Sequence, residues 1–169
     1  MPNRSTDAYE TYLHDFLRED LWVCCPGCGL KAVVKTDPGA DSFHAADASK
    51  IRVSCTGCGF SRRYAEQPDL LQSAEGSRRA FSASVRAGRM CDPFFYLPLW
   101  LQTDFGGELL WAYNPAHLRF LRHHIGAPLR ERSGEEHANR SLGSRLPKWM
   151  LASGKREALL RKLDQLAEK

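Results

Sequence analysis

Two short segments of nearly identical sequence constrain this chain more than any other feature. Residues 25–29 read CPGCG and residues 55–59 read CTGCG, so each is a Cys-x-x-Cys pair followed by a glycine. Two such knuckles supply four thiols, and a tetrahedral zinc ion prefers four soft ligands of this kind. The spacing therefore predicts one structural Zn²⁺ ion held by Cys25, Cys28, Cys55 and Cys58.

The glycines of the two knuckles have a mechanical role in this prediction. The chain must turn tightly within each knuckle so that backbone amides point at the sulfurs. Glycine adopts positive φ without the steric penalty that a Cβ atom brings. We therefore expect positive φ at Gly27, Gly29, Gly57 and Gly59.

Other chemistries of paired cysteines fit the sequence less well. Rubredoxins hold iron with two similar knuckles, but in a much smaller protein with an aromatic shell that this chain does not reproduce. Thioredoxin-like redox chemistry needs one Cys-x-x-Cys at the start of a helix, and the surroundings here are strand-like. A catalytic zinc ion needs an open coordination position, which four thiolates do not leave. Cys24 does not share the paired spacing, and His44 in a polar loop is interpreted as solvated.

Composition and charge restrict the class of protein. The chain has 169 residues and a formal net charge of +4. It shows neither a long apolar stretch nor an export signal, so we expect a cytoplasmic protein whose cysteines bind metal rather than form disulfides. Residues 50–90 contain 8 Lys and Arg against 3 acidic residues, and residues 115–169 contain 12 against 6. A polyanionic partner would therefore meet these two segments rather than the whole surface.

Four consecutive segments are expected, which together give an α+β fold. Residues 1–20 predict an amphipathic helix with an acidic exposed face. Residues 21–65 predict the metal module, a small antiparallel sheet with strands before and after each knuckle. Residues 66–90 predict a basic connector, and residues 91–169 predict an aromatic β-hairpin followed by about three helices.

Arginine is concentrated at the end of the metal module and in the connector, and lysine and arginine recur on the C-terminal helices. The planar guanidinium of arginine binds two phosphate oxygens at once, which suits it to nucleic acid. A solvated charged surface explains these residues equally well. The candidate nucleic-acid-binding residues are Arg62, Arg63, Arg78, Arg79, Lys148, Lys155 and Arg156.

The C-terminal module opens with two aromatic strand-like runs. Residues 94–103 and 108–113 flank the turn-prone segment 104–107, which predicts a β-hairpin. Core packing explains these aromatic side chains better than a base-stacking platform, because residues 91–114 contain no Lys or Arg.

The helices that follow have recognisable boundaries. Asn114 and Pro115 mark the start of the first helix, which we expect to reach about residue 132, and Ser153 is expected to cap the last.

The first of these helices carries three histidines. Adjacent residues on a helix point about 100° apart, so His123 and His124 cannot both face one metal ion. We interpret His117, His123 and His124 as solvated, with a catalytic role as a minor alternative.

The strand–knuckle–strand pattern around both cysteine pairs resembles a zinc ribbon of the transcription-factor-IIB type. Residues 99–103, 110–114 and 144–150 read LWLQT, LWAYN and SRLPKWM, and they resemble segments of uncharacterised bacterial proteins described as containing such a ribbon. The resemblance covers most of the chain and implies an architecture without supplying an activity. It also implies that the hairpin is a second ribbon-like element that has lost its metal ion.

These observations favour a binding protein rather than an enzyme. The sequence contains no glycine-rich phosphate loop, no His-Glu-x-x-His and no Gly-x-Ser-x-Gly motif. We expect a non-catalytic zinc-ribbon protein that contacts nucleic acid or a nucleic-acid-bound machine. The alternative is a protein–protein adaptor that uses the acidic N-terminal helix and the aromatic hairpin. Neither a membrane nor a small-molecule substrate is expected.

Overall fold

The computed structural model describes four stretches of the chain, and the structural statements that follow concern these residues alone. They are residues 11–40, 45–67, 88–127 and 141–169. Most of the expected basic connector, including Arg78 and Arg79, lies outside them, so that part of the prediction is not tested.

Two compact units make up the chain. The ribbon unit comprises residues 17–114, and the helical unit comprises residues 1–16 together with residues 115–169. The hairpin therefore groups with the ribbon, whereas the sequence grouped it with the C-terminal helices.

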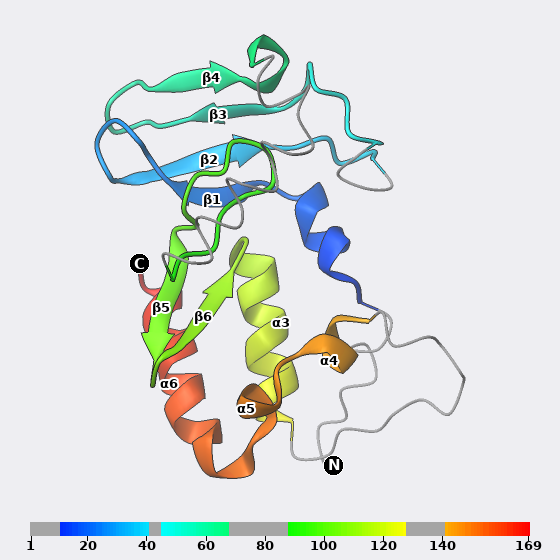
Figure 1. Cartoon of the computed structure of the whole chain (residues 1–169), viewed down its shortest axis with the longest axis vertical. Coiled ribbons are helices and arrows are strands. Elements are labelled where there is room, and N and C mark those ends of the chain that lie inside the picture. The colour runs from blue at the N-terminus through cyan, green and yellow to red at the C-terminus, as the bar shows by residue number, and fades with distance from the viewer. Residues whose placement is uncertain (1–10, 41–44, 68–87, 128–140) are drawn as a thin grey trace. The chain divides into compact units, whose positions relative to one another are not determined.

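A four-stranded antiparallel sheet forms the first part of the ribbon unit (Figure 1). Its strands are β1 (Leu21–Cys24), β2 (Lys31–Lys35), β3 (Arg52–Ser54) and β4 (Ser61–Arg63), and each pairs with the next along the chain. Alternation of apolar and polar residues buries one face of this sheet. The buried side chains are Leu21, Val23, Ala32, Val34 and Val53. The predicted α+β class, with the paired cysteines beside an N-terminal sheet, is confirmed.

The predicted β-hairpin is present, with a tighter turn than expected. It consists of β5 (Leu101–Phe105) and β6 (Glu108–Ala112), which are antiparallel. Only Gly106 and Gly107 connect the strands, with φ of 63° and 87°. Two successive residues with positive φ make a type I′ turn, whose twist matches that of the strands.

Backbone hydrogen bonds explain why the hairpin belongs to the ribbon unit. The Trp22 amide in β1 donates to the Tyr113 carbonyl at 2.9 Å, and the Trp22 carbonyl accepts from Trp100 at 2.9 Å. The Cys24 amide donates to the Pro98 carbonyl at 2.8 Å. These bonds satisfy polar groups that an edge strand would otherwise leave unpaired. Backbone pairing of this kind leaves little mark in the side-chain pattern, so the sequence did not reveal it.

Residues 91–98 form a loop where the sequence predicted the start of an aromatic strand. Asp92 is completely buried, and its carboxylate accepts hydrogen bonds from the amides of Phe94, Phe95 and Leu97 at 2.8–2.9 Å. Burial raises the pKa of Asp92 to about 6, although these amides favour the ionised form. The three bonds hold the chain in a turn, and the strand begins only at Leu101.

Two helices of 12 residues pack on one another in the helical unit. They are α3 (Pro115–Gly126) and α6 (Arg156–Ala167). Arg122 of α3 and Asp164 of α6 form an ion pair at 2.5 Å. Apolar residues at helical spacing bury their side chains: Leu118, Leu121, Ile125, Leu159, Leu163 and Leu166. The helix start at Pro115 is confirmed, but α3 ends at Gly126, six residues earlier than expected.

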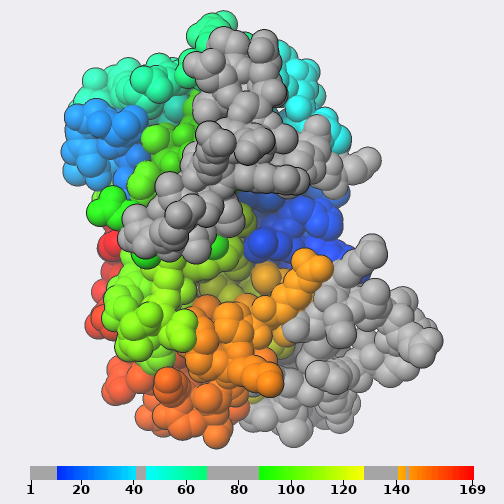
Figure 2. Space-filling model, viewed as in Figure 1, coloured from blue at the N-terminus to red at the C-terminus, as the bar shows by residue number. Residues whose placement is uncertain are grey.

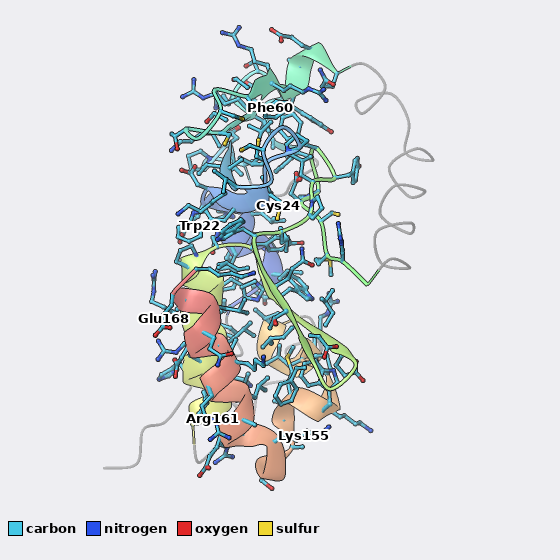
Figure 3. All side chains as sticks on the ribbon, turned by 90° about the vertical axis from the view of Figure 1, so that its left-hand side faces the viewer. Trp22, Cys24, Phe60, Lys155, Arg161 and Glu168 are labelled. Carbon is cyan, nitrogen blue, oxygen red and sulfur yellow. The ribbon has the colours of Figure 1, made fainter. Side chains whose placement is uncertain are left out.

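Three short elements precede α6 in the described residues 141–155. They are α4 (Leu142–Arg145), α5 (Lys148–Leu151) and the 3₁₀ helix η5 (Ser153–Lys155). Ser153 does not cap α6, because Lys155 is its N-cap residue and makes no side-chain cap bond. Figure 3 labels Lys155, Arg161 and Glu168 along η5 and α6. No helix in the described stretches is long and apolar enough to cross a membrane.

The predicted N-terminal helix is described only from residue 11. It contains the 3₁₀ helix η2 (Leu13–Arg18) rather than a longer α-helix. Asp15 accepts a hydrogen bond from the Tyr12 amide at 2.7 Å, so its carboxylate satisfies a backbone N–H group at the start of this helix. Phe16 is buried, and its ring stacks on that of His117 with centroids 4.7 Å apart.

The interpretation of the three histidines as solvated was wrong for two of them. His117 and His124 are 2% and 1% exposed, and only His123 is exposed to solvent. His117 and His124 are seven residues apart and share the apolar face of α3 with Leu121. Burial lowers the pKa of His117 to about 3, so its imidazole is neutral at pH 7.

Candidate metal centre

The two knuckles are closed by the same backbone hydrogen bonds. In the first, the Cys25 amide donates to the Leu30 carbonyl at 2.7 Å, and the Gly29 amide donates to the Cys25 carbonyl at 2.9 Å. The second knuckle repeats both bonds at 2.8 and 3.0 Å. Each knuckle joins two neighbouring strands, and both lie at the same end of the sheet (Figure 1).

Only the glycine that follows each cysteine pair adopts the expected positive φ, with 73° at Gly29 and 74° at Gly59. The prediction for Gly27 and Gly57 was wrong, because these two glycines provide space instead. A Cβ atom on Gly57 would lie 3.0 Å from Leu30 Cδ1 and 3.6 Å from the Cys55 sulfur. The middle glycine of each knuckle therefore keeps bulk away from the sulfurs.

The four cysteine sulfurs form a compact cluster. The Cys25 and Cys58 sulfurs are 3.6 Å apart, as are those of Cys28 and Cys55. All four lie within 4.8 Å of one another. A tetrahedral ion with Zn–S bonds of about 2.3 Å requires sulfurs about 3.8 Å apart. The donor set and its spacing therefore fit a four-thiolate site that could hold one metal ion.

Thiols this close compete for ionisation. Burial opposes ionisation of Cys25, but the amides of Cys28 and Gly27 donate to its sulfur and lower its pKa to about 7. The pKa of Cys28 is raised to about 12, although the Leu30 amide lowers it, because burial and the neighbouring thiols oppose a further negative charge. A divalent cation would remove this competition, since it lets all four sulfurs bind as thiolates.

The sulfur cluster lies near the surface on one side. Cys25 and Cys55, the first cysteines of the two knuckles, are each 3% exposed, whereas Cys28 and Cys58 are exposed to solvent. Figure 2 shows the blue and teal segments that carry the knuckles at the surface of the ribbon unit. The first cysteine of each knuckle thus fixes the cluster to the core, and the second closes it from outside.

The remaining cysteines in the described residues are not part of this cluster. Cys24 precedes Cys25 on β1, and its sulfur approaches the Leu99 carbonyl at 3.7 Å instead. Cys91 is 2% exposed, and its backbone forms a bridge with Pro98. His44, the other residue considered near the metal, lies outside the described residues.

The structure distributes the candidate nucleic-acid-binding residues over both units. Arg62 and Arg63 lie on β4, where every side chain is exposed. Lys148 begins α5, Lys155 ends η5 and Arg156 begins α6.

Two further basic residues of the ribbon were missed by the sequence analysis. Lys35 on β2 and Arg52 on β3 are exposed and lie beside Arg63 across the sheet. The strand register would have revealed them. If the strands on either side of each knuckle are paired residue by residue, starting at the cysteines, Lys35 comes to lie opposite Arg52, and Arg52 opposite Arg63.

Comparisons of this chain with known proteins find no matching family model, no matching curated protein and no matching solved structure.

Proposed function

We propose that this chain is a non-catalytic zinc-ribbon protein of the cytoplasm that contacts nucleic acid or a nucleic-acid-bound machine. The observation that carries the proposal is the cluster of four cysteine sulfurs at one end of a sheet with exposed arginines. Four thiolates match the preference of Zn²⁺ and leave no position for a catalytic water, so the role of the ion is structural. The resemblance to bacterial ribbons of the transcription-factor-IIB type supports the same proposal.

The zinc component is tested by elemental analysis of the purified protein. We expect about one zinc per chain, as four thiolates bind one tetrahedral ion. Cys58→Ser should lose most of this zinc, whereas Cys24→Ser should retain it, because the Cys24 sulfur approaches Leu99 rather than the cluster. Iron in place of zinc, or equal metal loss in the two variants, would contradict the proposal.

The nucleic-acid component is tested by a pull-down from the native cell with and without nuclease. Binding through basic side chains and phosphates should weaken steeply as salt is raised. We expect nucleic acid to co-purify at low salt and nuclease to release any associated machine. Failure to bind single-stranded or duplex probes at about 50 mM salt would contradict the proposal, because phosphate contacts are strongest there.

The adaptor alternative uses the aromatic hairpin and the N-terminal segment to dock on another protein. Phe105 and Trp111 of the hairpin are half-buried, so part of each ring is accessible to a partner. A protein that stays bound after nuclease treatment, and after charge reversal of Arg62 and Arg63, would favour this alternative.

A further inference from the structure

We infer that the outer face of the ribbon sheet is the nucleic-acid-binding surface, and that three cations in a row across it hold the phosphates of a single strand. The cation row consists of Lys35, Arg52 and Arg63. This inference rests on the proposed function and identifies the surface that would perform it.

The strand register places the three cations side by side. Lys35 of β2 is directly opposite Arg52 of β3, and Arg52 is directly opposite Arg63 of β4. Directly opposite residues of antiparallel strands point to the same face, with Cβ atoms about 4.5–5.5 Å apart. The row therefore crosses three strands and spans about 10 Å, which is two strand spacings. All three side chains are exposed.

Like charges in directly opposite positions destabilise a sheet. At the two ends of the cation row, carboxylates reduce this repulsion. Lys35 forms an ion pair with Asp20, and Arg63 forms one at 3.8 Å with Glu66 of the 3₁₀ helix η4 (Tyr64–Glu66). For Arg52, in the centre, no ion pair occurs among the residues that the structure describes. The centre of the row thus carries positive charge that a bound anion would neutralise.

The rest of this face suits a phosphate backbone. Ser54 and Ser61 are opposite one another beside the cation row, and hydroxyls of this kind donate hydrogen bonds to phosphate oxygens. Val33 of β2 lies opposite Ser54, and Trp22 of β1 lies opposite Val33. The Lys31 ammonium group lies 4.0 Å from the centroid of the Trp22 indole ring. Figure 3 labels Trp22 on β1. None of the outward-facing residues of the four strands is acidic.

A single nucleic-acid strand fits this surface better than a duplex or an acidic protein. Arg52 and Arg63 can each bind two oxygens of one phosphate, and phosphates recur at regular intervals along a strand. The major groove of a duplex admits an α-helix or a projecting two-stranded β-hairpin, whereas the cation row lies on the face of a four-stranded sheet. An aromatic ring beside cations is also typical of surfaces on which unpaired bases stack.

The test compares two triple variants of the full-length, zinc-loaded protein. The row variant carries Lys35→Gln, Arg52→Gln and Arg63→Gln. The control variant carries Arg119→Gln, Arg161→Gln and Lys162→Gln, which removes the same charge from the helical unit. Circular dichroism and zinc content establish that both variants are folded. Fluorescence anisotropy then measures the binding of a labelled single-stranded oligonucleotide between about 50 and 200 mM salt.

We expect the row variant to bind the oligonucleotide about 10- to 100-fold more weakly than the wild type at about 50 mM salt. The slope of log K against log salt should be smaller in magnitude by about 2, because three phosphate contacts are lost and each contributes about 0.7 for a single strand. The control should stay within about twofold of the wild type. If the wild type binds and the row variant binds equally well, or the control loses as much, the inference fails and the proposed function survives. Preferential binding of a duplex or of polyglutamate through the row would also overturn it. If the wild type binds no nucleic acid, the proposed function itself fails.

Discussion

Asp92 determines the course of the chain before the hairpin. Its two oxygens accept three amide hydrogen bonds in a completely buried position. The same loop contains Tyr96 with a φ of 56°, a conformation that favours glycine and costs energy for a bulky side chain. The Asp92 bonds offset this strain, so a single carboxylate holds a loop that the aromatic sequence alone would extend into a strand.

Asp92→Asn should lower the free energy of unfolding by about 1–3 kcal/mol, the cost of leaving buried polar groups unsatisfied. An asparagine would place an NH₂ group where a carboxylate oxygen now accepts the bond from the Leu97 amide. Urea denaturation followed by tryptophan fluorescence measures the change. Asp104→Asn is the control, because Asp104 is exposed and accepts a bond from Gly107 at 3.1 Å. Equal losses in the two variants would contradict the role given to Asp92.

His117 makes the stability of the helical unit depend on pH. Its pKa is about 3 in the folded protein because of burial, against about 6.5 in an unfolded chain. Between these values the unfolded chain binds more protons, so the free energy of unfolding falls as pH falls below about 6.5, by up to about 1.4 kcal/mol per pH unit. Above that pH the His117 contribution is constant.

His117→Phe should flatten this pH dependence, since phenylalanine can stack on Phe16 and does not titrate. The measurement is the urea midpoint at 222 nm at about pH 5 and about pH 7.5 in wild type and variant. His123→Phe is the matched control, because His123 is exposed. A wild-type pH dependence retained in the His117 variant would show that the imidazole is not buried as described.

At the scale of elements, the sequence predicted those features that depend on the type and spacing of side chains. The paired cysteines, the alternation in β2 and β3 and the start of α3 at Pro115 all follow from residue type and spacing. The sequence could not predict the bonds of Trp22 and Cys24 to the hairpin flanks, because any residue can make them through its backbone. The burial of His117 and His124 was missed because histidine is compatible with both surface and core, and only the tertiary packing decides.

The glycines of the knuckles show the same distinction. Gly29 and Gly59 adopt positive φ, whereas Gly27 and Gly57 leave room beside the cysteine sulfurs. Gly59→Ala should destabilise the ribbon by about 1–2 kcal/mol, the cost of a left-handed backbone for a residue with Cβ. Apart from the adjacent residues of the chain, no atom lies within 4 Å of that Cβ, so the effect is conformational. Gly59→Asn should lose less, because asparagine tolerates this region. Thermal unfolding measures both, with Gly154→Ala as a control at an open position without positive φ. Equal effects of alanine and asparagine would contradict this explanation.

At the scale of the whole molecule, the division into two units predicts that removal of the metal ion unfolds part of one unit and leaves the other folded. A structural four-thiolate zinc site contributes roughly 10–16 kcal/mol in small zinc peptides. Chelation should therefore unfold the ribbon, residues 21–65, while α3 and α6 keep their mutual packing. Hydrogen exchange followed by mass spectrometry measures both at once. Protection of β1–β4 that survives removal of the metal would show that metal binding by the sulfur cluster is not needed for the fold.

Asp37 closes the long connection between β2 and β3 at its base. It is 7% exposed and accepts bonds from the Asp47 amide and the Lys50 ammonium group at 3.1 Å each, and these two interactions lower its pKa. The pairing of Lys35 with Arg52 begins just beyond these two interactions. A peptide tag inserted between Gly39 and Ala45 should then leave the metal site intact, which offers a place to attach a reporter to the ribbon.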